Sequence, residues 1–199
     1  MMRSVLVVLA MIPMATRAAD LSVGTFEVSG GSNFVFESSS NDFTDSLGQT
    51  TTTDTRTFGL DVTGLYYVIP NFGVGLGLAY QNSEDESGGV TFGSSTLLIG
   101  PAAGFAFPIQ DNLSLAVQGQ LGYVTATFTE TGSPDQDASG FGFGLGAGLK
   151  FFLAKSFSLD AGLGYNYTKV TYDTPFGSKP ENTNSGFGLN VGFSVYFGR

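Results

Sequence analysis

Four charged residues stand inside stretches that otherwise alternate large apolar and small residues: Glu27, Asp61, Lys150 and Asp160. Such side chains can form ion pairs or, as paired carboxylates, take part in acid–base catalysis. A period of two indicates β-strands, so each charge points away from the apolar face of its strand. Counting back from a turn at 154–155, Lys150 and Asp160 fall nearly opposite each other on neighbouring strands. We therefore expect a cross-strand ion pair within a polar lumen.

The chain contains no histidine and no cysteine. This excludes disulfides, thiolate metal sites and cysteine nucleophiles, and it removes the commonest general base and zinc ligand. Serine, aspartate and glutamate remain, but no carboxylate pair can be placed closely enough to propose hydrolysis. We therefore expect a protein that is not an enzyme and that holds no cofactor and no metal.

The charged residues are positioned by eight period-two segments, which are separated by alternately long and short polar linkers. The predicted strands are 22–37, 55–69, 72–81, 94–107, 113–128, 140–153, 156–172 and 186–199. The long linkers are 38–54, 82–93, 129–139 and 173–185. One face of each strand is apolar and the other is small and polar, which is typical of strands with lipid outside and a polar lumen inside. The pattern predicts an all-β protein, an eight-stranded antiparallel transmembrane β-barrel with an up-and-down meander.

Two alternatives to a plugged membrane barrel remain open. A secreted lipocalin-like barrel also has eight strands, but it is apolar inside and polar outside. The polar cluster could also be the gate of a narrow pore. We favour a plug that satisfies its own buried charges, because the interior of an eight-stranded barrel is just wide enough for side chains to fill.

Acidic residues are concentrated in the predicted long linkers. They include Asp42, Asp45, Glu84, Asp85, Glu86, Asp135 and Asp137. Such loops could bind cationic partners, or divalent ions shared with lipopolysaccharide phosphates. The simpler interpretation is a solvated, self-repelling rim, and we favour it. The run at 84–86 lacks the spaced ligands of a calcium loop.

Residues 1–19 have the pattern of a cleaved secretory signal peptide. Arg3 precedes an apolar run at 5–14, which is only about half of the roughly 20 residues that a spanning helix needs. The expected barrel domain is therefore 20–199. Losing Arg3 and Arg17 leaves six of the 8 basic residues against 17 acidic ones, a net charge of −11. A nucleic-acid partner is not expected at this charge.

Several stretches resemble the OmpA/OmpX-like outer-membrane β-barrel family. One opens the first strand and two look like the family's periplasmic hairpins: Gly24 to Gly30, Tyr66 to Gly77, and Asp111 to Leu115. The last strand is similar to the family's C-terminal assembly signal, carried here by Asn190, Gly192, Val195 and Phe197. The usual terminal aromatic residue is followed in this chain by Gly198-Arg199, which is a small departure from the family's pattern.

The resemblance implies an integral protein of the cell outer membrane. Its implied partners are outer-membrane lipids, lipopolysaccharide and the barrel-assembly machinery, and an extracellular ligand is left open. The implied role is structural or interactive, through envelope integrity and surface contact by acidic extracellular loops. A narrow passive porin-like channel for small solutes is the alternative. Barrels of similar architecture that modify lipids depend on histidine, so this enzymatic alternative is less favoured here.

Overall fold

The computed structural model describes residues 21–34, 43–44, 50–51, 54–87, 90–132, 134–172 and 181–198. The long strands are β1 (Phe26–Phe34), β4 (Asp54–Ile69), β5 (Phe72–Ser87), β6 (Val90–Gln110), β7 (Leu113–Glu130), β8 (Gln136–Ala154), β9 (Phe157–Tyr172) and β10 (Glu181–Phe197). A separate pair is formed by β2 (Phe43–Thr44) and β3 (Thr50–Thr51). Among the described residues, no helix is long and apolar enough to cross a membrane.

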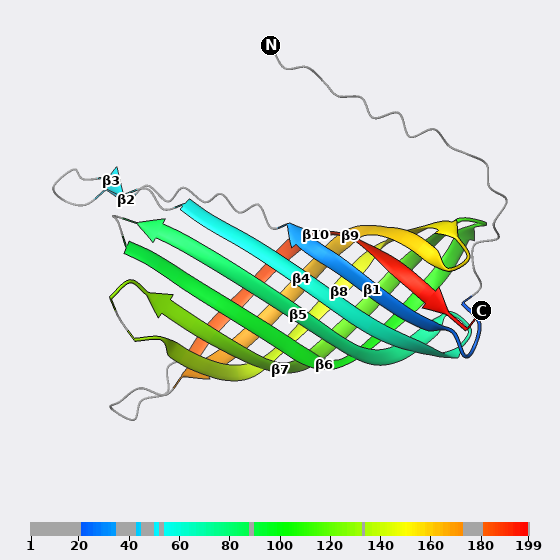
Figure 1. Ribbon diagram of the computed structural model, residues 1–199, viewed down its shortest axis with the longest axis horizontal. Coiled ribbons are helices and arrows are strands. Elements are labelled where there is room, and N and C mark those ends of the chain that lie inside the picture. Colours follow the sequence, from blue (N-terminus) through cyan, green and yellow to red (C-terminus); the bar gives the residue numbers. More distant parts are fainter. Residues whose placement is uncertain are drawn as a thin grey trace, which may run out of the picture.

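The long strands close into a barrel, because β1 pairs with β10 on one side and with β4 on the other. Val28 marks this closure, since it lies opposite Val195 of β10 and Gly64 of β4. The start of β1 and the end of β10 lie at the same end of the barrel as the tight turns, which we call the turn end (Figure 1). The opposite end is the loop end. The predicted eight-stranded antiparallel meander is confirmed, and the pairing of β1 with both β10 and β4 closes the ring.

Several predicted strand boundaries are wrong, mostly because the strands are longer than the apolar pattern. The linker predicted at 82–93 is almost entirely strand, since β5 continues to Ser87 and β6 begins at Val90. At the loop end, β8 begins at Gln136 and β10 at Glu181, earlier than predicted. Backbone pairing does not depend on lipid-facing side chains, so it continues after the apolar alternation stops. The point at which apolar and polar residues stop alternating therefore marks where a strand leaves the membrane, and the strand continues beyond that point.

The two faces of the barrel wall differ as a membrane barrel requires. On β10, Phe187 is 77 % exposed on the outside, whereas Tyr196 is 2 % exposed inside the lumen. Leu76 and Leu163 are likewise more than half exposed on the outer face. Large apolar side chains that are exposed around the whole barrel need lipid to cover them. This arrangement is the reverse of a lipocalin-like barrel.

Candidate functional site

The charged side chains at the turn end of the lumen form one network. Lys150 of β8 lies directly opposite Asp160 of β9, and its Nζ donates to Asp160 Oδ2 at 2.9 Å. The same Nζ donates to Glu27 Oε1 at 2.6 Å. Glu27 is 0 % exposed and Lys150 is 6 % exposed, so water solvates neither charge to any large extent. The structure thus brings together three of the four predicted lumen residues.

Neutral side chains complete the hydrogen bonding of these carboxylates. Tyr67 OH donates to Glu27 Oε2 at 2.5 Å, and Ser158 Oγ donates to Asp160 Oδ1 at 2.7 Å. Ser194 Oγ accepts from Lys150 Nζ at 2.8 Å and lies within hydrogen-bond range of both carboxylates. Because a hydroxyl has one proton, Ser194 donates to one carboxylate at a time. The strand phase of β10 predicts that Ser194 faces the lumen, but sequence reasoning included neither Ser158 nor Ser194 in the charged cluster.

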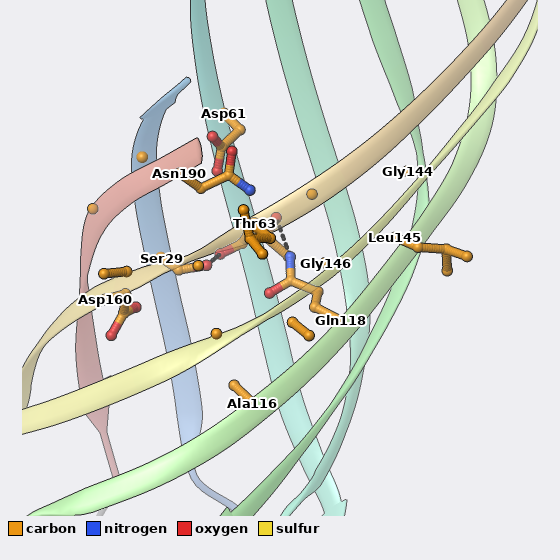
Figure 2. A pocket seen from close by; sticks show the side chains of 18 of the residues that line it. Ser29, Asp61, Thr63, Ala116, Gln118, Gly144, Leu145, Gly146, Asp160 and Asn190 are labelled. Carbon is orange, nitrogen blue, oxygen red and sulfur yellow. Dashed lines mark hydrogen bonds between the residues drawn. The ribbon is translucent and has the colours of Figure 1, made fainter. Parts of the chain in front are cut away.

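Asp61 of β4 faces the lumen, where it lines a cavity in the middle of the barrel (Figure 2). The cavity has a volume of about 180 Å³, and Lys150 and Asp160 lie at its turn end. Its wall is otherwise built largely from glycine and from neutral polar side chains, including Thr63, Gln118, Gln120 and Asn190. Gln118 Nε2 donates to Thr63 Oγ1 at 3.0 Å, and this bond is drawn in Figure 2.

Glycines in the wall make the room that these amides occupy. A Cβ atom added at Gly77 would lie 2.3 Å from Gln120 Oε1. One added at Gly164 would lie 2.8 Å from Asn190 Nδ2. Gln120 Nε2 is buried and has no hydrogen-bond partner among the described residues. The cavity wall therefore contains at least one donor without a partner among the described residues.

Residues 21–25 fold across the turn end, and we call them the N-terminal stopper. Leu21 and Thr25 are both 0 % exposed. The Leu21 N–H donates to Asn71 Oδ1 at 3.1 Å, and the Asn71 N–H donates to the Leu21 carbonyl at 2.8 Å. The Tyr67 N–H donates to the Thr25 carbonyl at 2.9 Å. Leu21 packs in an apolar cluster with Leu65, Tyr67, Ala102, Ala106, Phe152 and Tyr196.

This stopper corrects the prediction that the first strand begins at residue 22, because β1 begins at Phe26. Gly24 has a positive φ of 90°, which turns the chain out of the extended path and into the barrel mouth. Asn71, with φ of 63°, turns the facing hairpin so that its amide meets the stopper. Both residues were visible in the sequence, but nothing there indicated that Asn71 would bond with Leu21.

The predicted acidic loops are only partly loops. Glu84, Asp85 and Glu86 lie in β5, and Asp137 lies in β8, where its Oδ1 accepts from Thr127 Oγ1 at 2.9 Å. Their assignment to loops is therefore wrong, for the reason given for the strand ends. Asp135 lies in the exposed connection between β7 and β8. Asp42 and Asp45 lie outside the described residues.

The residues of the predicted assembly signal all lie on β10. Asn190 lines the cavity and Gly192 lies opposite Gly31 of β1. Val195 and Phe197 lie opposite Val28 and Phe26, and the Phe26 and Phe197 rings are 6.4 Å apart. The motif therefore sits at the seam where the ring closes, and its role in assembly stays a prediction.

A closed antiparallel ring with a lipid-facing apolar exterior and a plugged polar lumen defines an integral outer-membrane β-barrel. The chain belongs to the family described as outer membrane protein beta-barrel domain, which matches residues 4–198. Membership of this family implies a location in the outer membrane. Among the described residues, no group of three or more potential acidic metal ligands gathers in one place.

Solved structures with a similar fold are also outer-membrane proteins. Neisserial surface protein A is 21 % identical, with a TM-score of 0.54, over 87 % of this chain and 96 % of that one. OprG from Pseudomonas aeruginosa is 15 % identical, with a TM-score of 0.55, over 94 % of this chain and 100 % of that one. Ail of Yersinia pestis, in complex with the heparin analogue sucrose octasulfate, is 17 % identical, with a TM-score of 0.50, over 87 % and 99 % of the chains. The comparison with curated proteins returns no significant match.

Proposed function

We propose that the protein is a closed outer-membrane barrel with a structural and surface-interaction role, and that it is not a pore. The observation that carries the proposal is the double closure of the turn end. The N-terminal stopper fills the mouth with the buried side chain of Leu21. Directly inside it, the Lys150 network joins β1, β8, β9 and β10 by charged hydrogen bonds. A solute would have to break both layers to pass.

The charge at the loop end supports contact with cationic partners. Glu84, Glu130, Asp135 and Asp137 are all exposed on or beside the loop-end parts of the strands. A sulfated sugar such as the one bound to Ail would be repelled by such a surface, so that ligand is not carried over. We propose that this end faces lipopolysaccharide through shared divalent ions, or a basic extracellular partner.

Two further partners are proposed, outer-membrane lipids and the barrel-assembly machinery, from the lipid-facing surface and from the last strand. The outer face of β8, β9 and β10 carries an aromatic ladder in which Phe143 and Tyr167 stack at 5.3 Å, and Tyr165 and Phe187 lie 4.9 Å apart. Aromatic side chains prefer the membrane interface, which suits contact with outer-membrane lipids. We propose that the barrel-assembly machinery recognises the exposed Phe197 at the end of β10. Catalysis has no part in the proposal, since the chain has neither histidine nor cysteine.

Planar-bilayer recording on the refolded mature chain tests the closed barrel. We expect no discrete conductance steps, because both layers at the turn end stay in place. A variant that lacks residues 20–25 and also carries Lys150→Ala removes both layers and should conduct. Heat-dependent gel mobility shows whether each protein has folded and inserted. Reproducible steps from the unmodified chain would reject the closed barrel and favour the narrow passive channel.

A further inference from the structure

We propose that the outer wall formed by β7, β8, β9 and β10 binds the phosphorylated sugar headgroup of an outer-leaflet glycolipid, the lipid A part of lipopolysaccharide. The contact is direct and needs no bridging metal ion. The inference rests on the proposed surface role, because that role orients the loop end toward the cell exterior. It adds a particular side of the barrel and a particular partner chemistry.

The outward-facing apolar side chains of these four strands form stretches of one length. They run from Leu113 to Tyr123 on β7, from Phe141 to Phe151 on β8, from Phe157 to Tyr167 on β9 and from Phe187 to Phe197 on β10. Each stretch has about 11 residues, which is the length with which a tilted strand crosses the hydrocarbon of a bilayer. The next outward position toward the loop end therefore lies at the level of the lipid headgroups.

Hydroxyl and ammonium groups occupy this level, and we call them the headgroup row. The row consists of Thr125 of β7, Ser139 of β8, Lys169 of β9 and Ser185 of β10. The side chains of Thr125, Ser139 and Ser185 are exposed. The register places Lys169 one diagonal step from Ser139 and one from Ser185. Diagonal neighbours on one face of a sheet are about 7–8 Å apart, so the long Lys169 side chain and a serine hydroxyl can hold the same phosphate group.

The positions around Lys169 suit an anion. Its register partners are Phe141 and Thr183, and neither is acidic. The acidic residues Asp137 of β8 and Glu181 of β10 lie further from the membrane than the headgroup row. An ammonium group has three N–H donors, so Lys169 has a donor for a phosphate oxygen whatever else it contacts.

The opposite side of the barrel has the reverse charge pattern. On β4 and β5 the outward positions beyond the aromatic side chains include Asp54, Glu84 and Glu86, and Arg56 lies opposite Glu84 in the register. Carboxylates at headgroup level repel phosphate. The charge distribution therefore directs a phosphorylated headgroup to β7–β10 rather than to β4 and β5.

The rest of a glycolipid fits the wall around the row. Toward the turn end, Phe143 and Tyr167 stack at 5.3 Å and Tyr165 and Phe187 lie 4.9 Å apart, which offers acyl chains a continuous aromatic surface. Hydroxyl groups both donate and accept hydrogen bonds, so the row matches the hydroxyl groups of a sugar as well as its phosphates. A phosphatidylglycerol headgroup is smaller than a phosphorylated disaccharide and reaches fewer of these side chains.

Native mass spectrometry of the refolded mature chain, in an uncharged detergent with a metal chelator present, tests the site. The probe is purified lipid A that carries both phosphates. We expect lipid A to bind in the micromolar range, and dephosphorylated lipid A and phosphatidylglycerol to bind at least about tenfold more weakly.

Two variants add the same charge at headgroup level on different sides of the barrel. Ser139→Asp places a carboxylate in the headgroup row beside Lys169 and should weaken lipid A binding about tenfold, because it repels the phosphate. The matched control is Asn82→Asp, at the first outward position beyond Tyr80 of β5, which should bind as the unmodified chain does. Heat-dependent gel mobility shows whether each variant has folded.

A second pair of variants removes positive charge. Lys169→Gln should weaken lipid A binding about tenfold, because it loses a charge-assisted hydrogen bond to the phosphate. Its matched control is Lys155→Gln, in the exposed turn between β8 and β9 at the other end of the barrel, which should leave binding unchanged.

Four results would overturn the proposal. They are the absence of a lipid A complex, equal binding by the Ser139→Asp and Asn82→Asp variants, equal binding by the Lys169→Gln and Lys155→Gln variants, and phosphatidylglycerol binding as tight as that of lipid A. Binding that appears only when calcium replaces the chelator would also reject the direct site, while it would support the metal-bridged contact of the proposed function. None of these results bears on conductance, so the closed barrel is judged separately.

Discussion

Replacing Lys150 with methionine should strongly destabilise the barrel. Methionine keeps an apolar stem but removes the ammonium group, which donates to Glu27 at 2.6 Å, Asp160 at 2.9 Å and Ser194 at 2.8 Å. Glu27 is 0 % exposed and would remain as a buried carboxylate without its cation. An uncompensated buried charge is among the most costly defects in a folded protein.

The structure sets the expected size of this loss. Removing one partner of a buried ion pair costs about 3–5 kcal/mol. We expect about 3 kcal/mol, because Tyr67 still donates to Glu27, and the Asp160 side chain is 21 % exposed and keeps contact with lumen water. Asp160→Asn leaves the pair of Lys150 and Glu27 intact and should cost less, about 1–2 kcal/mol.

Equilibrium unfolding in urea, with the protein refolded into lipid vesicles, measures these losses. Far-ultraviolet circular dichroism is the suitable signal, because the chain has no tryptophan. Adding Glu27→Gln to Lys150→Met should recover at least about 1 kcal/mol, since the most deeply buried carboxylate is then neutral. Adding Asp160→Asn instead should recover little, because Glu27 keeps its charge. Additive losses for Glu27 and Lys150, or a loss below about 1 kcal/mol for Lys150→Met, would refute the network argument.

Two further predictions use matched neighbours as controls. Tyr67→Phe removes the donor to Glu27 Oε2 and should cost about 1–3 kcal/mol in the same unfolding assay, whereas Tyr66→Phe, on the lipid face, should cost little. An equal effect of both changes would contradict the proposed bond. Phe197→Ala should slow insertion of newly made protein into the outer membrane, and Phe193→Ala, also exposed on β10, should not. Insertion is measured by following heat-resistant gel mobility over time, and equal rates for the two variants would count against the assembly signal.

The sequence correctly predicts the wall of this barrel, and the reason is local. Side chains alternate sides along any strand, so Phe187 and Tyr196 could be assigned to opposite faces without knowledge of the fold. Adjacent strands joined by a short turn have a register that can be counted, which is why Lys150 and Asp160 were placed opposite each other. The predicted strand boundaries at the loop end were wrong because side-chain polarity indicates contact with water, whereas strand pairing is made by the backbone. β5, for example, continues to Ser87.

The sequence by itself therefore determined the number of barrel strands, which side chains face outward and inward, and that the barrel lies in a membrane. Only the tertiary structure decided which side chains contact one another inside the lumen. Glu27 lies 123 residues from Lys150, and the two are joined because closure brings β1 beside β10 and the lumen is narrow enough for side chains to reach across it. The packing of the N-terminal stopper depends on the same closure, since Phe152 and Tyr196 belong to the apolar cluster around Leu21. The bond between Leu21 and Asn71, by contrast, needs only the pairing of the neighbouring strands β1 and β4. Strand periodicity is a property of neighbouring residues, whereas contacts across a lumen depend on how all the strands tilt and close together.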